Sequence, residues 1–373
     1  MFLSELELKN YRNYQTLHIN FSPRVNIFFG QNAQGKTNIL EAAGILSLGR
    51  SFRTKKDVEL IRWEQEFCFV KGIFTEDPEI ELIEIGIGNN QKKIKINRQE
   101  KKNNELFGLI PVVIFSPEDL QLIKGGPQNR RDFIDLYLAQ VEPNYRNVYY
   151  NFQRILQQRN RFLKDRYHEK TELEVWNNQL VEHGTKVICY RAELIEKVKP
   201  YIKNAHLNIS NENEIIDLEY LSVKGLPVKD QTEAQLKELF YDELHALRRM
   251  EIDRKMTLVG PQRDDLRLTI GNAKSQNQVE LRNFGSQGQQ RTAALALKLG
   301  LVEIITEIRG KTPLLLLDDV MSEFDDTRKK ALLKMLLSSS QTFLTSTSKQ
   351  DFPIEDLQTL FFEVNRGEVL NAS

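Results

Sequence analysis

The chain has 373 residues, of which 40% are hydrophobic and 28% are charged. This composition excludes a disordered chain and is sufficient for two or more domains with apolar cores. The 52 basic residues balance the 52 acidic ones, which excludes a general attraction to nucleic acid or to an anionic membrane, so any such binding must use a local patch.

The cysteines and the apolar segments indicate a cytoplasmic protein without a membrane partner. Cys68 and Cys189 lie far apart and in no metal-ligand pattern, as expected of free buried thiols in a reducing compartment. The amino-terminal residues alternate like a strand and lack the features of a signal peptide. The longest aliphatic run, Leu314–Leu317, is far below the roughly 20 residues that span a bilayer.

Residues 1 to about 115 are predicted to be rich in β-strands that surround a phosphate-binding loop. Val25–Phe29 is typical of a short buried strand, and residues 38–43 begin a helix. The residues between them match the P-loop pattern G-x-x-x-x-G-K-[ST]. Further strands are predicted at 6–8, 17–19, 67–70, 83–87 and 94–96.

The P-loop predicts a site for ATP and Mg²⁺. Gly30 and Gly35 let the backbone wrap so that successive N–H groups point at phosphate oxygens, and the following helix presents its positive end. Lys36 is expected to reach the β and γ phosphates, and Thr37 to offer its hydroxyl to Mg²⁺. The predicted nucleotide-binding residues of this loop are Gly30, Gln31, Asn32, Ala33, Gln34, Gly35, Lys36 and Thr37.

The middle of the chain changes to long helical stretches amid many charges, from residue 130 to about 203. A strand at 217–223, a helix at 232–254 and a strand at 266–270 are predicted after it. We therefore expect an N-terminal part of the first ATPase lobe at 1–123, a mainly helical second lobe or arm at 124–255, and a C-terminal part of the ATPase head at 256–373.

Basic residues gather near residues 50–56, 92–102 and 130–161. In the second group lysines alternate with Ile94 and Ile96, which suits a hairpin with one cationic face, although charge runs are usually solvated surface. Phosphate contacts of this type give affinity without sequence readout. The candidate DNA contacts are Lys92, Lys93, Lys95, Arg130 and Arg131.

The segment 284–291 places a serine and a glycine before a helix. A helix start with open backbone amides suits an anion, so Ser286, Gly288 and Gln289 are candidates to bind the γ phosphate of a nucleotide held by another subunit. An ordinary capped helix is the alternative.

The aliphatic run Leu314–Leu317 and the two acids after it have the form of a Walker B motif. A buried parallel strand would deliver Asp318 to Mg²⁺ at its carboxyl end, and Asp319 would orient or deprotonate the attacking water. The predicted catalytic residues are Lys36, Asp318 and Asp319, with Thr37 and Asp318 as metal ligands. A solvated turn or a helix cap is the alternative for the two acids.

The order of the motifs, from the P-loop through Ser-x-Gly-Gln and aliphatic-Asp-acid to residues 322–325, resembles that of ABC-type ATPases. This resemblance implies an α/β fold, an ABC-type, SMC-like ATPase head with a helical insertion arm, and a homodimer that forms on ATP. Two departures stand out. The strand near residue 345 is followed by hydroxyls instead of the usual His, which leaves Thr347 or a neighbour, and only Glu118 and Asp119 are candidates for the usual linking Gln.

Five further blocks are similar to those of the bacterial RecF family. They lie at residues 8–14, 49–54, 116–120, 125–131 and 260–266. The resemblance implies a weak, DNA-dependent ATPase that binds single-stranded DNA and junctions in recombinational gap repair, maintains replication forks, and supports recombinase loading and the SOS response with the partners RecR and RecO. Two other classes stay open on the same motifs: the ATPase subunit of a membrane transporter, and a scaffold that uses ATP only to dimerise.

Overall fold

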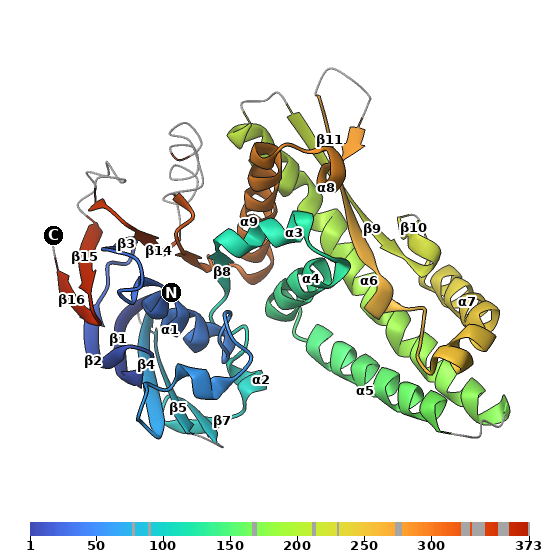
Figure 1. Ribbon diagram of the computed structural model, residues 1–373, viewed down its shortest axis with the longest axis horizontal. Coiled ribbons are helices and arrows are strands. Elements are labelled where there is room, and N and C mark those ends of the chain that lie inside the picture. The colour runs from blue at the N-terminus through green and yellow to red at the C-terminus, as the bar shows by residue number, and fades with distance from the viewer. Residues whose placement is uncertain are drawn as a thin grey trace. The chain divides into compact units, whose positions relative to one another are not determined.

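The computed structural model describes residues 1–76, 79–88, 91–165, 170–210, 214–229, 231–272, 278–321, 329, 340–349 and 358–371. It divides into two compact units (Figure 1). Unit 1 comprises residues 1–119 and 302–373, and unit 2 comprises residues 120–301. Helix α9 (Gln287–Arg309) begins in unit 2 and ends in unit 1.

Unit 1 contains an antiparallel sheet with the strand order β2-β1-β4-β5-β6-β7. Side chains on each long strand alternate between a buried inner face and an outer face, as the period of two requires. Helix α1 contacts β4 and β5 of this sheet. The strands are β1 (Phe2–Tyr11), β2 (Tyr14–Asn20), β4 (Phe67–Glu76), β5 (Glu79–Gly88), β6 (Lys92–Ile96) and β7 (Gln99–Lys101).

The second sheet of unit 1 has the order β16-β15-β3-β14-β13-β8 and is parallel except for β16. Its aliphatic strands are buried on both faces, as parallel strands usually are. Helix α1 contacts this sheet too, and eleven of its residues are buried. The elements are β3 (Val25–Phe29), α1 (Lys36–Leu48), β8 (Val112–Phe115), β13 (Leu314–Leu317), β14 (Thr342–Ser346), β15 (Thr359–Asn365) and β16 (Glu368–Asn371).

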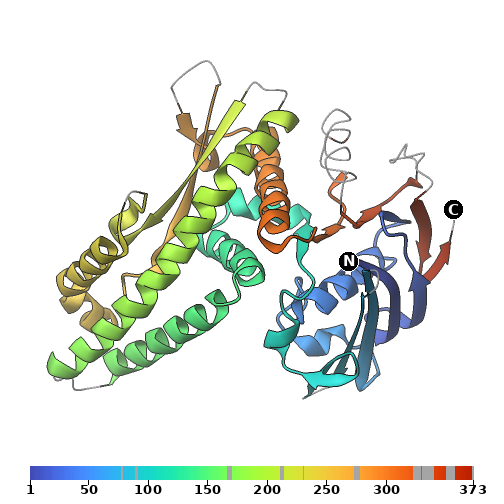
Figure 2. The ribbon, with the colours of Figure 1, turned by 180° about the vertical axis from the view of Figure 1, so that it is seen from behind.

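Unit 2 is built on one long helix, α6, which packs against α5, α7 and the strand β9 (Figure 2). At 40 residues α6 is about 60 Å long. A second antiparallel sheet has the order β10-β9-β11-β12. The main elements are α4 (Pro127–Val141), α5 (Tyr145–Lys164), α6 (Lys170–Ile209), β9 (Glu214–Ser222), β10 (Leu226–Pro227), α7 (Glu233–Arg254), β11 (Asp265–Asn272) and β12 (Gln278–Glu280). The short helices of the chain are η1 (Asp57–Leu60), α2 (Asn103–Leu106), η2 (Pro117–Leu120), α3 (Gln121–Lys124), η3 (Val223–Gly225), η4 (Pro261–Arg263) and α8 (Leu281–Phe284).

The division of the chain differs from the expected one at the second boundary, between residues 255 and 256. We expected residues 256–373 to group together, but residues 256–301 belong to unit 2. The reason is the sheet of unit 2, in which β11 pairs with β9 along eight residues. The predicted strand at 266–270 is therefore confirmed as β11, yet it extends the arm and does not return to the first lobe.

Candidate nucleotide-binding site

The P-loop follows a central strand of the parallel sheet. Strand β3 lies between β14 and β15, and α1 begins at Lys36, which confirms the predicted strand–loop–helix context. Gly30 and Gly35 have φ angles of 148° and 120°, which other residues rarely adopt. A Cβ atom at Gly30 would lie 2.4 Å from the carbonyl oxygen of Val364, and one at Gly35 2.6 Å from Nδ2 of Asn13. The φ angle therefore favours glycine at both positions, and at Gly30 the close backbone carbonyl also excludes a side chain.

Neighbouring turns hold the loop at Gln34 and Gly35. Nδ2 of Asn13 donates to the carbonyl oxygen of Gln34 over 2.8 Å, and the Tyr14 hydroxyl donates to that of Gly35 over 3.1 Å. From the turn between β15 and β16, the Arg366 N–H donates to Oε1 of Gln34 over 2.7 Å. The Gly367 N–H donates to the carbonyl oxygen of Gln34 over 3.2 Å. Gln34 therefore fixes the loop to the neighbouring turns, while Gln31, Asn32 and Ala33 are exposed to solvent.

Lys36 lies folded over the loop. Its Nζ donates to the carbonyl oxygens of Gly30 at 2.6 Å and Gln31 at 2.9 Å. Burial lowers the pKa of Lys36, against the opposing effect of the nearby carboxylates Asp319 and Asp318. Among the described residues no carboxylate lies at hydrogen-bond distance from Lys36 Nζ, and a cation of this kind at the amino end of α1 provides what a phosphate group requires. The loop formed by Gly30, Gly35 and Lys36 therefore fits the phosphates of a nucleoside triphosphate.

Asp318 meets two hydroxyls at the carboxyl edge of the parallel strands. Its Oδ1 accepts from Thr37 Oγ1 at 2.7 Å and from Thr345 Oγ1 at 2.9 Å. Burial raises the pKa of Asp318, although both of these hydrogen bonds oppose the shift. One carboxylate and one threonine hydroxyl side by side are oxygen ligands of the kind that Mg²⁺ takes. The predicted pair Thr37 and Asp318 is therefore brought together, and the pair fits that ion.

Thr345 was not identified from the sequence. Besides contacting Asp318, its Oγ1 accepts from the Asp319 N–H at 2.8 Å, and Asp319 has a φ of 50°. Thr347, our expected substitute for the usual His, is exposed and follows the end of β14. The signal that would have found Thr345 is its place near the carboxyl end of a buried strand, since parallel strands present those ends at one edge.

A buried ion pair supports the helix after the P-loop. Glu41 of α1 is 0% exposed, and Arg12 donates to both of its carboxylate oxygens, at 2.8 and 2.7 Å. Ser51 Oγ donates to the same carboxylate at 2.5 Å, and Arg53 at 3.4 Å. Burial on its own would raise the pKa of Glu41, but the hydrogen bonds from Arg12 and Ser51 outweigh it and the pKa is lowered. The blocks at residues 8–14 and 49–54, noted in the sequence, thus both contact Glu41 of α1.

The serine segment begins α9 with a capping box. The Ser286 N–H donates to Oε1 of Gln289 at 2.7 Å, and the Gln289 N–H donates to Ser286 Oγ at 3.2 Å. Nε2 of Gln289 also donates to Glu214 at 2.7 Å. The capped-helix alternative is thus the observed local structure, and a role of Ser286, Gly288 and Gln289 toward a second subunit stays a prediction.

Two other predictions concern short segments. Glu118 and Asp119 lie in the short helix η2, where Oδ2 of Asp119 accepts from the Ser116 N–H at 3.0 Å. Nothing here gives either residue the role of the usual linking Gln. The segment 322–325, which completed the order of motifs, lies outside the described residues.

The candidate DNA contacts separate into exposed and engaged side chains. Lys93 and Lys95 are exposed on β6, whereas Lys92 pairs with Asp57 at 3.0 Å. Arg130 is 3% exposed and donates to both carboxylate oxygens of Asp265, at 2.6 and 2.9 Å. This burial contradicts Arg130 as a DNA contact.

Arg131 is also engaged within unit 2. Its guanidinium donates to the carbonyl oxygen of Asp264 at 2.6 Å and to Oε1 of Gln128 at 2.8 Å. The side chain is half-buried, and burial lowers its pKa. Its geometry therefore favours a structural role, and contact with DNA is not supported.

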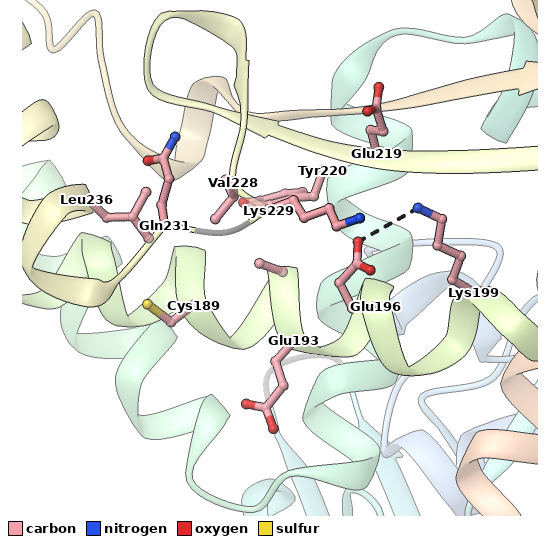
Figure 3. Close-up of a pocket in the computed structure, with 11 residues that line it drawn as sticks. Cys189, Glu193, Glu196, Lys199, Glu219, Tyr220, Val228, Lys229, Gln231 and Leu236 are labelled. Carbon is pink, nitrogen blue, oxygen red and sulfur yellow. Dashed lines mark ion pairs between the residues drawn. The ribbon is translucent and has the colours of Figure 1, made fainter.

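Unit 2 also holds a pocket of about 360 Å³ between α6, β9 and the start of α7 (Figure 3). Cys189 lies at one end of it, and Lys199 pairs with Glu196 at 3.9 Å near the other. Charges of both signs line it, and none of its lining residues belongs to the motifs above. The pocket is therefore not part of the candidate nucleotide site.

Comparison with known proteins places this site in a family. The family model described as RecF/RecN/SMC N terminal domain matches residues 2–366. The DNA replication and repair proteins RecF of Bacillus thuringiensis (strain Al Hakam) and Bacillus cereus (strain AH187) are each 40% identical over 367 residues, covering 96% of this chain and 95% of the relative. The chain belongs to the RecF family.

Solved structures agree with this membership. A structure of the recombination mediator protein RecF-ATP in the RecFOR pathway has a TM-score of 0.89 at 36% identity, covering 100% of this chain and 98% of that one. The SMC head bound to the C-winged helix domain of ScpA has a TM-score of 0.59 at 14% identity, which shows the fold alone. The predicted SMC-like ATPase head is confirmed. Among the described residues, no helix is long and apolar enough to cross a bilayer.

Proposed function

We propose that this RecF-family protein is an ATP-driven DNA-binding protein of recombinational gap repair and replication-fork maintenance, acting in the cytoplasm. The observation that carries the proposal is the convergence of Lys36, Thr37 and Asp318 at one edge of the parallel sheet. This is the geometry that phosphoryl transfer needs: a backbone cradle, a cation and a metal-side carboxylate. The RecF-ATP likeness supports ATP as the nucleotide.

Different residues of the site would bind the phosphates and the Mg²⁺ ion. The N–H groups of residues 30–37 and the amino end of α1 face the phosphates, and Lys36 exchanges its two carbonyl partners for phosphate oxygens. Thr37 and Asp318 would hold Mg²⁺, which supplies charge neutralisation at the phosphates when bound. Thr345 keeps Asp318 oriented toward Thr37.

Hydrolysis requires a base or an orienting group for water. Asp319 is next to Asp318, and its backbone is fixed by Thr345, so its carboxylate is the candidate for that role. Ser286, Gly288 and Gln289 of a second copy complete the site in an ATP-dependent homodimer. We infer a weak, DNA-dependent ATPase that acts as a switch.

The family supports the wider role. Its relatives are named DNA replication and repair proteins, and the solved relative is a recombination mediator of the RecFOR pathway. For this chain we propose binding to single-stranded and junction DNA, partnership with RecR and RecO, recombinase loading on gaps, and a contribution to SOS induction.

Binding to gapped, duplex and single-stranded DNA tests the proposal, measured with and without ATP and Mg²⁺ while the mass in solution is followed. ATP-dependent dimers on DNA are expected. Dimers that form on ATP without phosphate release would make the protein a scaffold. No DNA binding in any condition would overturn the proposal and favour the transporter class, which shares the ATPase motifs.

A further inference from the structure

The outer face of the antiparallel sheet in unit 1 carries aromatic and cationic side chains that the nucleotide site does not use. Two adjoining hollows lie on it, of about 410 and 920 Å³, and Phe69 lines both. Phe67 is 49% exposed, and Lys9 Nζ lies 5.9 Å from the centre of its ring. We call this surface, made of Lys9, Phe67, Phe69, Gly86, Lys93 and Lys95, the outer-face groove.

The strand register brings these side chains together. In the ladder between β4 and β5, Phe69 lies opposite Gly86, and Gly86 lies opposite Lys93 in the next ladder. A Cβ atom at Gly86 would meet nothing within 4 Å, so the sheet is open there beside an aromatic ring. A flat group therefore has room to lie against Phe69 and Phe67.

The charges of the groove favour an anion. Lys93 and Lys95 are exposed, and within the described part of the chain neither has an ion-pair partner. The acidic residues Glu5 and Glu7 on the same face are paired with Lys71, at 3.8 and 2.9 Å. Glu84 of β5 and Glu100 of β7 lie opposite Lys95 in the register, whereas Lys9 and Lys93 have no acid opposite them among the described strand pairs.

We infer that the outer-face groove binds single-stranded DNA, with bases stacked on Phe67 and Phe69 and phosphates on Lys9, Lys93 and Lys95. Aromatic rings flanked by lysines on a sheet provide stacking and charge together, and only unpaired bases expose their faces to such rings. Lys93 and Lys95 lie two residues apart on β6 and therefore face the same side of the sheet, about 7 Å apart. The inference rests on the proposed DNA-binding function and assigns it a strand-selective site.

Fluorescence anisotropy with an oligothymidylate of about 16 nucleotides tests the inference. We expect Phe67→Ala to weaken binding about fivefold or more, and Phe67→Leu to weaken it similarly, because an apolar side chain without a π-face does not replace stacking. Tyr150→Ala, which removes a tyrosine that is 67% exposed on unit 2, is the matched control and should leave affinity unchanged.

Charge reversal gives the second variant. Lys93→Glu should weaken binding to the single strand and make that binding depend less steeply on salt concentration. Lys255→Glu, at an exposed lysine of unit 2, should change neither property. Photo-crosslinking of a bromouracil-substituted strand should label the peptide that contains Phe67. Circular dichroism checks that each variant is folded.

The outcomes separate this inference from the proposed function. Loss of single-strand binding in Phe67→Ala, with ATP-dependent duplex binding intact, supports it. Equal loss on duplex and single strand would overturn base stacking. Duplex binding without any single-strand binding would overturn the inference and leave the proposed function standing. If the variants bind DNA normally and lose only binding to a protein partner, the inference is overturned as well.

Discussion

The ion pair between Arg12 and Glu41 predicts a measurable loss of stability. The Glu41 carboxylate is 0% exposed and receives two charge-assisted hydrogen bonds from Arg12. Removing one partner of a buried pair costs about 3–5 kcal/mol. The Arg12 side chain is 20% exposed, and Ser51 remains bound to the carboxylate, so we expect Arg12→Ala to cost about 2–3 kcal/mol.

Urea unfolding followed by circular dichroism measures this loss as a lower midpoint at constant slope. Glu41→Gln is the matched background, because a neutral amide leaves no buried charge behind. In that background Arg12→Ala should cost only about 1 kcal/mol. An equal cost in both backgrounds would show that the buried charge is not the cause, and an unchanged midpoint would refute the reasoning altogether.

The pH dependence has a defined sign. The folded-state pKa of Glu41 is lowered, so the stability that its ionised form contributes is present above the unfolded pKa of about 4.3 and is lost as pH falls through the folded value. The difference in the free energy of unfolding between the unsubstituted protein and Arg12→Ala should therefore be largest at neutral pH and shrink below about pH 4. A difference that grows in acid would contradict the assignment.

Three further predictions concern the nucleotide site and the thiols. Asp319→Asn should slow phosphate release and prolong the ATP-bound dimer, seen by light scattering, and unchanged turnover and lifetime would exclude Asp319 as the group that orients water. Thr345→Val should lower ATPase activity about tenfold because Asp318 and Asp319 lose a common partner, whereas Thr347→Val should not; equal effects would remove the case for Thr345. With a thiol reagent at pH 8, half-buried Cys189 should react before Cys68, whose pKa burial raises to about 12; mass spectrometry of labelled peptides decides the order.

The nucleotide loop was predictable because its determinants are local. Glycines with φ above zero, a lysine and a threonine at fixed spacing between a strand and a helix leave few alternatives, and the structure has that strand and helix. Thr37 and Asp318 were also paired correctly, although they are 281 residues apart. The pairing was predictable because the threonine of a P-loop and the first acid of a Walker B motif are both expected to bind the same Mg²⁺.

The errors came from contacts that no local pattern encodes. Arg130 was taken as a DNA contact from its charge, but its partner Asp265 lies 135 residues further along the chain. Thr345 escaped notice because its role depends on β14 lying beside β13, and strand order is not encoded in either strand. Likewise, the boundary at residue 256 failed because the pairing of β11 with β9 is a long-range choice.

The attachment of Gln34 to the turn at Arg366 and Gly367 has a consequence for biosynthesis. The loop at residues 30–37 is made early, but its neighbours in the sheet and its outer clasp are supplied by residues from 342 to 367. On the ribosome the nucleotide cradle therefore cannot reach its final form until nearly the whole chain has emerged. Chains terminated before residue 366 would lack these contacts, so the loop would not be held to this turn at Gln34.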